Sequence, residues 1–122
     1  MLTGRTVELD DGLAALRAAL EQAAERLRRL PESRLRRGAA ARGRALADEL
    51  TRRAQLLEEP GPGGGTRRVP DAGLWAVGDQ ITVTGHDLLR AIARLADGGQ
   101  GGRGCAEREL REARALVADF TV

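Results

Sequence analysis

A repeating pattern of leucine and alanine constrains the fold of this chain more than any other feature. Apolar side chains recur at alternating steps of four and three residues, at Leu9, Leu13, Leu16, Leu20, Ala23, Leu27 and Leu30. This spacing places one apolar stripe along a helix, and it is sustained for three repeats. Asp10 or Asp11 could cap the helix by accepting from its free backbone N–H groups. The sequence therefore predicts a helix over residues 10–30.

A second stripe predicts a helix over residues 32–58, beyond Pro31, which breaks or kinks the chain. Its spacing of 4-4-3-4-4-3 is an 11-residue repeat, formed by Leu35, Ala39, Gly43, Leu46, Leu50, Ala54 and Leu57. Glycine inside a helix costs about 1 kcal/mol relative to alanine. Gly38 and Gly43 therefore mark places where this helix could bend. The small residues Ala39 and Gly43 would let the backbone of another helix approach closely.

Residues 71–97 fit two interpretations. The stretch ITVT at 81–84 alternates as in a short strand, and a capping box could then open a helix at Gly85. Alternatively, apolar residues throughout the region are spaced 3-4-4-3-4-3, as in one long helix that starts near Pro70. We favour the long helix, because a lone four-residue strand would have no partner in the rest of the chain.

A fourth amphipathic helix is predicted over residues 105–120, with apolar positions at Ala106, Leu110, Ala113, Val117 and Phe120. Two segments rich in proline and glycine, 60–70 and 98–104, are typical of flexible linkers. We therefore expect one domain, residues 1–122, of the all-α class. Its architecture would be an antiparallel bundle of about four amphipathic helices joined by Pro/Gly-rich loops, near residues 10–30, 32–58, 71–97 and 105–120.

The apolar composition suggests how such a bundle could interact. Leucine and alanine dominate, and the chain has one Trp, one Phe and no Tyr. With so few aromatic residues, we expect Trp75 to be an anchor, either in the core or at an interface, where tryptophan is enriched among binding hot spots. A heptad seam can also pair with its own copy or with a foreign helix. The candidate pairing residues are Leu13, Leu16, Leu20 and Leu27.

Positive charge is concentrated in one part of the chain. Residues 26–53 hold ten arginines against three acids, a net charge of +7, whereas the whole chain carries only +2. On the wheel of an unbroken helix, four arginines fall opposite the apolar stripe: Arg34, Arg37, Arg44 and Arg52. A solvated helix face explains this pattern most simply. The alternatives are a patch for an acidic partner or for a polyanion, although no aromatic residue is present to stack on bases.

Residues that usually carry catalysis are scarce. His86 is the only histidine, and Asp79, seven residues away, would lie ~10 Å along a helix, too far to orient it. Zinc sites need three or four ligands, and this sequence offers no recognisable grouping. The single cysteine, Cys105, excludes an intramolecular disulfide and fits a reducing compartment. No transmembrane span or signal peptide is visible, so we expect a cytoplasmic protein that does not contact a membrane.

These features predict a non-enzymatic protein-interaction or scaffold module that acts through leucine-rich helix faces. We expect a protein partner or self-association, and no catalytic residues, cofactor, metal or small-molecule substrate. The alternative hypothesis is low-specificity nucleic-acid binding through the arginine-rich segment 26–53, where phosphate neutralisation needs only positive charge.

Overall fold

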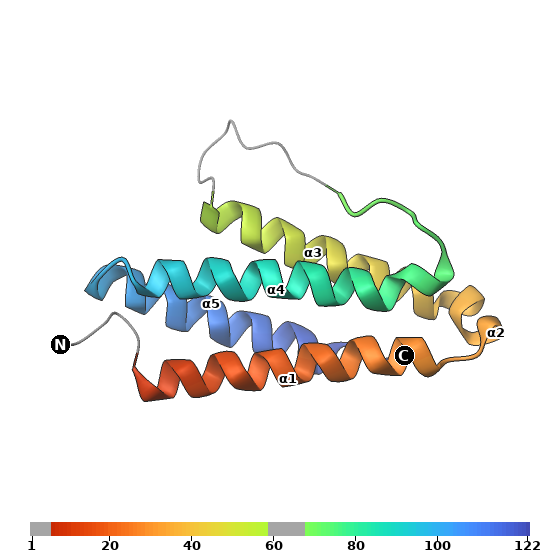
Figure 1. Cartoon of the computed structure of the whole chain (residues 1–122), viewed down its shortest axis with the longest axis horizontal. Coiled ribbons are helices and arrows are strands. Elements are labelled where there is room, and N and C mark those ends of the chain that lie inside the picture. The colour runs from red at the N-terminus through yellow and green to blue at the C-terminus, as the bar shows by residue number, and fades with distance from the viewer. Residues whose placement is uncertain (1–5, 59–67) are drawn as a thin grey trace.

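The computed structural model describes residues 6–58 and 68–122, and this part of the chain is helical with no strand (Figure 1). The four long helices are α1 (Val7–Arg29), α3 (Ala40–Glu58), α4 (Val77–Ala96) and α5 (Gln100–Asp119). Between them lie the short helix α2 (Glu32–Arg34), a π turn η1 (Leu35–Ala39) and a 3₁₀ turn η2 (Leu74–Ala76). The predicted all-α helical bundle is confirmed.

The long helices run in two directions. α1 and α5 point one way along the bundle, and α3 and α4 point the other way (Figure 1). α4 is therefore antiparallel to α1 and α5, as the sequence led us to expect, but it lies parallel to α3. Two contacts at opposite ends of α3 and α4 agree with this direction. Gly43 lies against Val77 near both starts, and Arg94 Nη2 lies 2.6 Å from Glu58 Oε1 near both ends.

α1 begins earlier than predicted because a different residue caps it. The Oγ1 of Thr6 accepts a hydrogen bond of 3.1 Å from the backbone N–H of Leu9, so the helix starts at Val7. The expectation that Asp10 or Asp11 would be the cap is wrong. Asp10 lies in the first turn, where a carboxylate favours the positive end of the helix dipole. The helix ends at Arg29, since proline at 31 holds Leu30 in an extended conformation.

The predicted helix over 32–58 is interrupted at Gly38. This residue has φ = 135°, a conformation that side chains strongly disfavour, so the chain turns there before α3 begins. Gly43, the other expected bend, stays helical. It is buried where α3 crosses α1 and α4, and a Cβ at this position would overlap Val77 Cγ1. Gly38 therefore permits a turn of the chain, and Gly43 permits close packing between helices.

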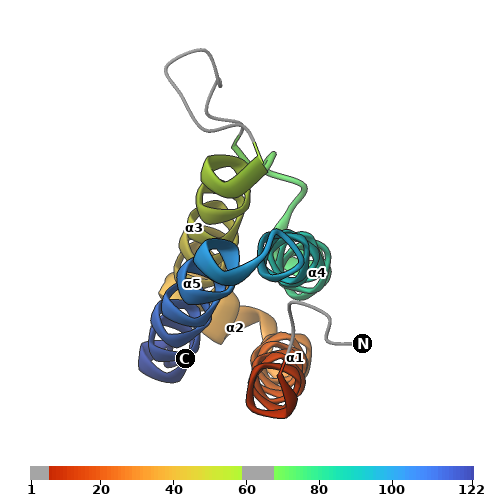
Figure 2. The same ribbon diagram turned by 90° about the vertical axis from the view of Figure 1, so that its left-hand side faces the viewer.

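The long-helix interpretation of residues 71–97 is confirmed, because residues 76–84 are helical rather than a strand. The helix starts later than expected, with η2 at Leu74 and α4 at Val77. α4 packs against α1, α3 and α5. Figure 2 shows α1 below α4 and both α3 and α5 to its left, so one side of α4 stays open. Its buried side contributes Val77, Ile81, Leu88 and Ile92 to the core. α4 is thus the central element of the bundle.

α5 begins five residues before its predicted start. Residues 100–104, expected as part of a glycine-rich linker, form its first turns, and the loop after α4 is reduced to 97–99, where Gly99 has φ = 94°. The other predicted linker, 60–70, lies mostly outside the described residues, and 68–70 carry no helix. In the part of the chain that the structure describes, no helix has the length and apolar character needed to cross a membrane.

Candidate interaction surface

The leucine seam of α1 is used inside the chain. Leu16, Leu20 and Leu27 are at most 2% exposed and belong to the core, while Leu13 is half-buried at its edge. Leu20 packs against Gly85 of α4, and Leu27 packs against Gly43 of α3. Three of the four candidate pairing residues are therefore covered by the chain's own helices. Of the leucine-rich face that we expected to meet a partner, only Leu13 keeps part of its surface uncovered.

The predicted arginine patch does not form one face. The wheel that grouped its four members assumed an unbroken helix, and the turn at Gly38 separates the first two from the others. Arg44 pairs with Asp71 at 3.2 Å, and Arg52 pairs with Glu49 at 2.6 Å. Arg34 and Arg37 are exposed, and neither makes an ion pair with any residue in 6–58 or 68–122.

Acids inside and outside the segment pair with many of its arginines. Of its ten arginines, six form ion pairs with described residues: Arg28, Arg29, Arg36, Arg44, Arg52 and Arg53. Arg28 reaches Asp79 on α4 at 2.8 Å, and Arg53 reaches Glu112 on α5 at 3.2 Å. A seventh, Arg42, donates to the backbone oxygen of Thr121. The net charge counted along the sequence therefore overstates the positive charge available on the surface.

An ionic cluster connects α3 to α5. The Arg53 guanidinium lies 2.8 Å from Glu49 Oε2 on its own helix and 3.9 Å from Glu109 Oε2 on α5, in addition to Glu112. Hydrogen bonding to Arg52, with further help from Arg53, lowers the pKa of Glu49, and the same bond raises the pKa of Arg52. These groups are partly buried and mutually satisfied, so we interpret the cluster as a structural connection between two helices.

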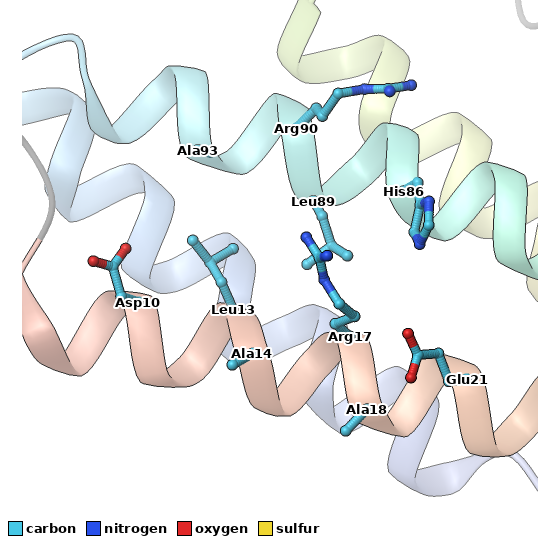
Figure 3. Close-up of a pocket in the computed structure, with 10 residues that line it drawn as sticks. All are labelled: Asp10, Leu13, Ala14, Arg17, Ala18, Glu21, His86, Leu89, Arg90 and Ala93. Carbon is cyan, nitrogen blue, oxygen red and sulfur yellow. The ribbon is translucent and has the colours of Figure 1, made fainter.

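A groove of about 660 Å³ separates α1 from α4 (Figure 3). Its floor is apolar, with Leu13 and Leu89, and its rims are charged, with Arg17 and Glu21 on α1 and His86 and Arg90 on α4. His86 and Glu21 face each other across the groove (Figure 3). Cys105 lies apart from this groove in the second turn of α5, where Arg108 Nη2 approaches its Sγ at 3.8 Å. Among the described residues, no group of three His, Cys, Asp or Glu side chains gathers as a metal site would require.

The outward face of α4 carries the surface that the sequence reasoning missed. Trp75 and Val83 are each 61% exposed, so the expectation of a core position for Trp75 is wrong and an interface position stays open. Counted at 100° per residue, six side chains fall within an arc of roughly 100° on this face. Trp75 lies in the η2 turn directly before α4, and the other five lie on α4 itself. We call the set the α4 outward stripe: Trp75, Asp79, Val83, His86, Arg90 and Arg94, all of them exposed.

A signal for this stripe was present in the sequence. The apolar positions that define the buried side of α4 leave a second set of residues at steps of 4-4-3-4-4, and that set contains a tryptophan and a valine. Comparison of the chain with protein-family models, with curated proteins and with solved structures found no match.

Proposed function

We propose that this chain is a non-enzymatic protein-interaction module whose binding surface is the α4 outward stripe. The exposure of Trp75 carries this proposal. Among residues 6–58 and 68–122, most large apolar side chains are buried or partly buried, and the exposed ones are Val7, Leu56, Val83 and Trp75, the chain's only indole. Large aromatic side chains surrounded by charge are typical of protein interfaces, where tryptophan supplies much of the binding energy.

The shape and chemistry of the surroundings support the same proposal. Val83 adds a second exposed apolar side chain about two turns further along α4. Asp79 lies between these two residues along the stripe, and Arg90 and Arg94 follow Val83, so charges of either sign favour one orientation of a partner over others. The groove between α1 and α4 borders the stripe, because His86 and Arg90 belong to both. A partner helix on α4 would therefore meet apolar contacts flanked by polar ones.

Site-specific photo-crosslinking tests this proposal. A photoreactive amino acid replaces Val83 in the stripe and, as a matched control, Ala115 on the exposed side of α5. In cells that produce the chain, we expect a discrete covalent adduct from position 83 and none from position 115. The mass of the adduct identifies the partner. Absence of any adduct at 83, with the chain folded and abundant, would contradict a binding role for this face.

A second candidate function, low-specificity polyanion binding, is favoured by one observation. Arg26, Arg34 and Arg37 are exposed and form no ion pair with a described residue, and they lie near the corner where α1 leads into α3. Phosphate binding by such groups depends on salt, with a slope of about −0.9 per neutralised phosphate on a log–log plot for duplex DNA.

Fluorescence anisotropy of labelled duplex DNA over a range of salt concentrations tests the polyanion candidate. Replacing Arg34 and Arg37 together by glutamine should reduce the salt slope by about two if each neutralises one phosphate. The matched control replaces Arg44 and Arg52, which already have acidic partners, and should leave the slope nearly unchanged. If DNA does not bind at low salt, these arginines are a solvated surface.

A further inference from the structure

The α4 outward stripe has a symmetric order. Its members are separated by 4, 4, 3, 4 and 4 residues, so the spacing is the same when read from either end. Two copies of such a helix, packed antiparallel on this face, place the first member opposite the last, the second opposite the fifth and the third opposite the fourth. The helix can therefore meet its own copy about a two-fold axis near the middle of α4, in register along the whole stripe.

The pairs that this register creates are chemically complementary. Asp79 lies opposite Arg90 of the other copy, so the second and fifth positions carry opposite charges. Trp75 lies opposite Arg94, where a guanidinium can stack on the indole face. Val83 lies opposite His86, which gives the centre of the contact an apolar side chain against an imidazole ring. A parallel arrangement would instead place each aspartate against its own copy and each arginine against its own copy.

The contacts already present within the chain leave room for these pairs. Asp79 accepts from Arg28 at 2.8 Å, yet its side chain is 75% exposed. Arg90 donates to Asp87 and Arg94 donates to Glu58, and both arginine side chains are about 70% exposed, at 70% and 68%. A carboxylate has about four acceptor sites and a guanidinium has five donors, so each group can take a second partner.

We infer that the occupant of the α4 outward stripe is a second copy of this chain, packed antiparallel against the first. This inference rests on the proposed function and names its partner. Each Asp79–Arg90 pair occurs twice in the dimer, since a two-fold axis repeats every contact. The leucine seam stays in the core of each copy, so the dimer forms between folded subunits through a mixed polar and apolar face.

Charge reversal tests this inference by sedimentation velocity over a range of protein concentrations. Asp79→Arg places two arginines against each other twice, and Arg90→Asp does the same with two aspartates. Each variant should raise the dimer dissociation constant by about tenfold or more. When the two variants are mixed, the charges are complementary again, and a heterodimer should form. Arg111→Asp, an equal charge reversal on the exposed side of α5, is the control and should dimerise as the unaltered chain does.

Tryptophan emission supplies a second measurement, because Trp75 is the only tryptophan in the chain. Its emission should shift to shorter wavelength as the dimer forms, and circular dichroism should confirm that each variant is folded. A chain that stays monomeric at all concentrations overturns the inference, as does a dimer that neither variant weakens. If the chain is monomeric but the crosslink at position 83 captures a different protein, the proposed function stands without the second copy. If there is neither dimer nor crosslink, both fail.

Discussion

The glycine at position 85 sets how closely α1 approaches α4. A methyl group there would lie 2.8 Å from Leu20 Cδ1, within a core where Leu20 is only 2% exposed. A contact this short forces one of the two groups to move, and packing an extra methyl group into a filled core costs about 1–3 kcal/mol. The helix propensity gained by replacing glycine is smaller, about 1 kcal/mol. Packing should therefore decide the outcome.

We predict that Gly85→Ala lowers the free energy of unfolding by up to about 2 kcal/mol, the packing cost less the gain in propensity. The matched control is Gly104→Ala on α5, where an added methyl group meets nothing within 4 Å. That variant should gain about 0.5–1 kcal/mol. Urea denaturation measures both values. If Gly85→Ala is stabilised as much as the control, the two helices are free to move apart and the close contact does not constrain them.

Trp75 shows what residue type alone does not determine. Its size and apolar surface predicted an anchor, and composition gave no reason to prefer the surface over the core. The periodicity of α4 held the missing information. Leu74, partly buried in η2, and Val77, fully buried in α4, lie on the core side. Trp75 follows Leu74 by one residue in the 3₁₀ turn, which turns it by about 120° away from that side. Direction on the helix, rather than hydrophobicity, decides where this side chain lies.

At the scale of elements, α3 and α5 are joined by charge. Leu46 and Phe120 line a groove between these helices near the C-terminus, and Arg53 reaches across to two glutamates of α5 further along. Glu49 holds Arg53 and Arg52 from the α3 side, with its side chain 28% exposed. Because the pKa of Glu49 is lowered in the folded chain, its ionised form stabilises the fold.

This direction fixes the pH dependence that we predict for Glu49→Gln. A carboxyl group with a lowered folded-state pKa stabilises the protein above its unfolded-state pKa, about 4.5, and the effect is lost as the pH falls through the folded-state pKa. The variant should lose about 1 kcal/mol near pH 7 and approach the unaltered chain in acid. Glu107→Gln, on the exposed side of α5, is the control. Denaturation at several pH values gives the comparison, and a difference that stays constant into acid would refute the assignment.

The helices themselves could be predicted from the sequence, but not all of their ends. Apolar periodicity located all four long helices, since burial of one side is what the pattern reports. Apolar periodicity did not predict the start of α5. Glycines at 101, 102 and 104 are costly in a helix, yet they form the first turns of α5. The α4 outward stripe could not be predicted from the sequence for a related reason. A period identifies which side chains share a face, but the packing of the whole bundle determines which faces stay uncovered.

At the scale of the whole molecule, α4 is the element on which the others depend. It packs against α1, α3 and α5, and its side chains Ile81 and Ile92 are fully buried. α3 packs mainly on α4 among the long helices, so this packing holds α3 in place. Opening of α4 would expose its interfaces with all three other long helices, whereas fraying of an outer helix end exposes little.

Hydrogen exchange should therefore rank the helices. We predict that backbone amides in the middle of α4 exchange most slowly, through opening that approaches global unfolding, and that those of the first turns of α5 exchange fastest among the long helices. Mass spectrometry should measure exchange in the Arg90→Asp variant, which we expect to be monomeric. In this variant, self-association cannot add protection to α4. Slower exchange in α1 or α3 than in α4 would show that the bundle is stabilised around another helix. In the unaltered chain, protection of α4 that increases with protein concentration would support the inferred contact between two copies.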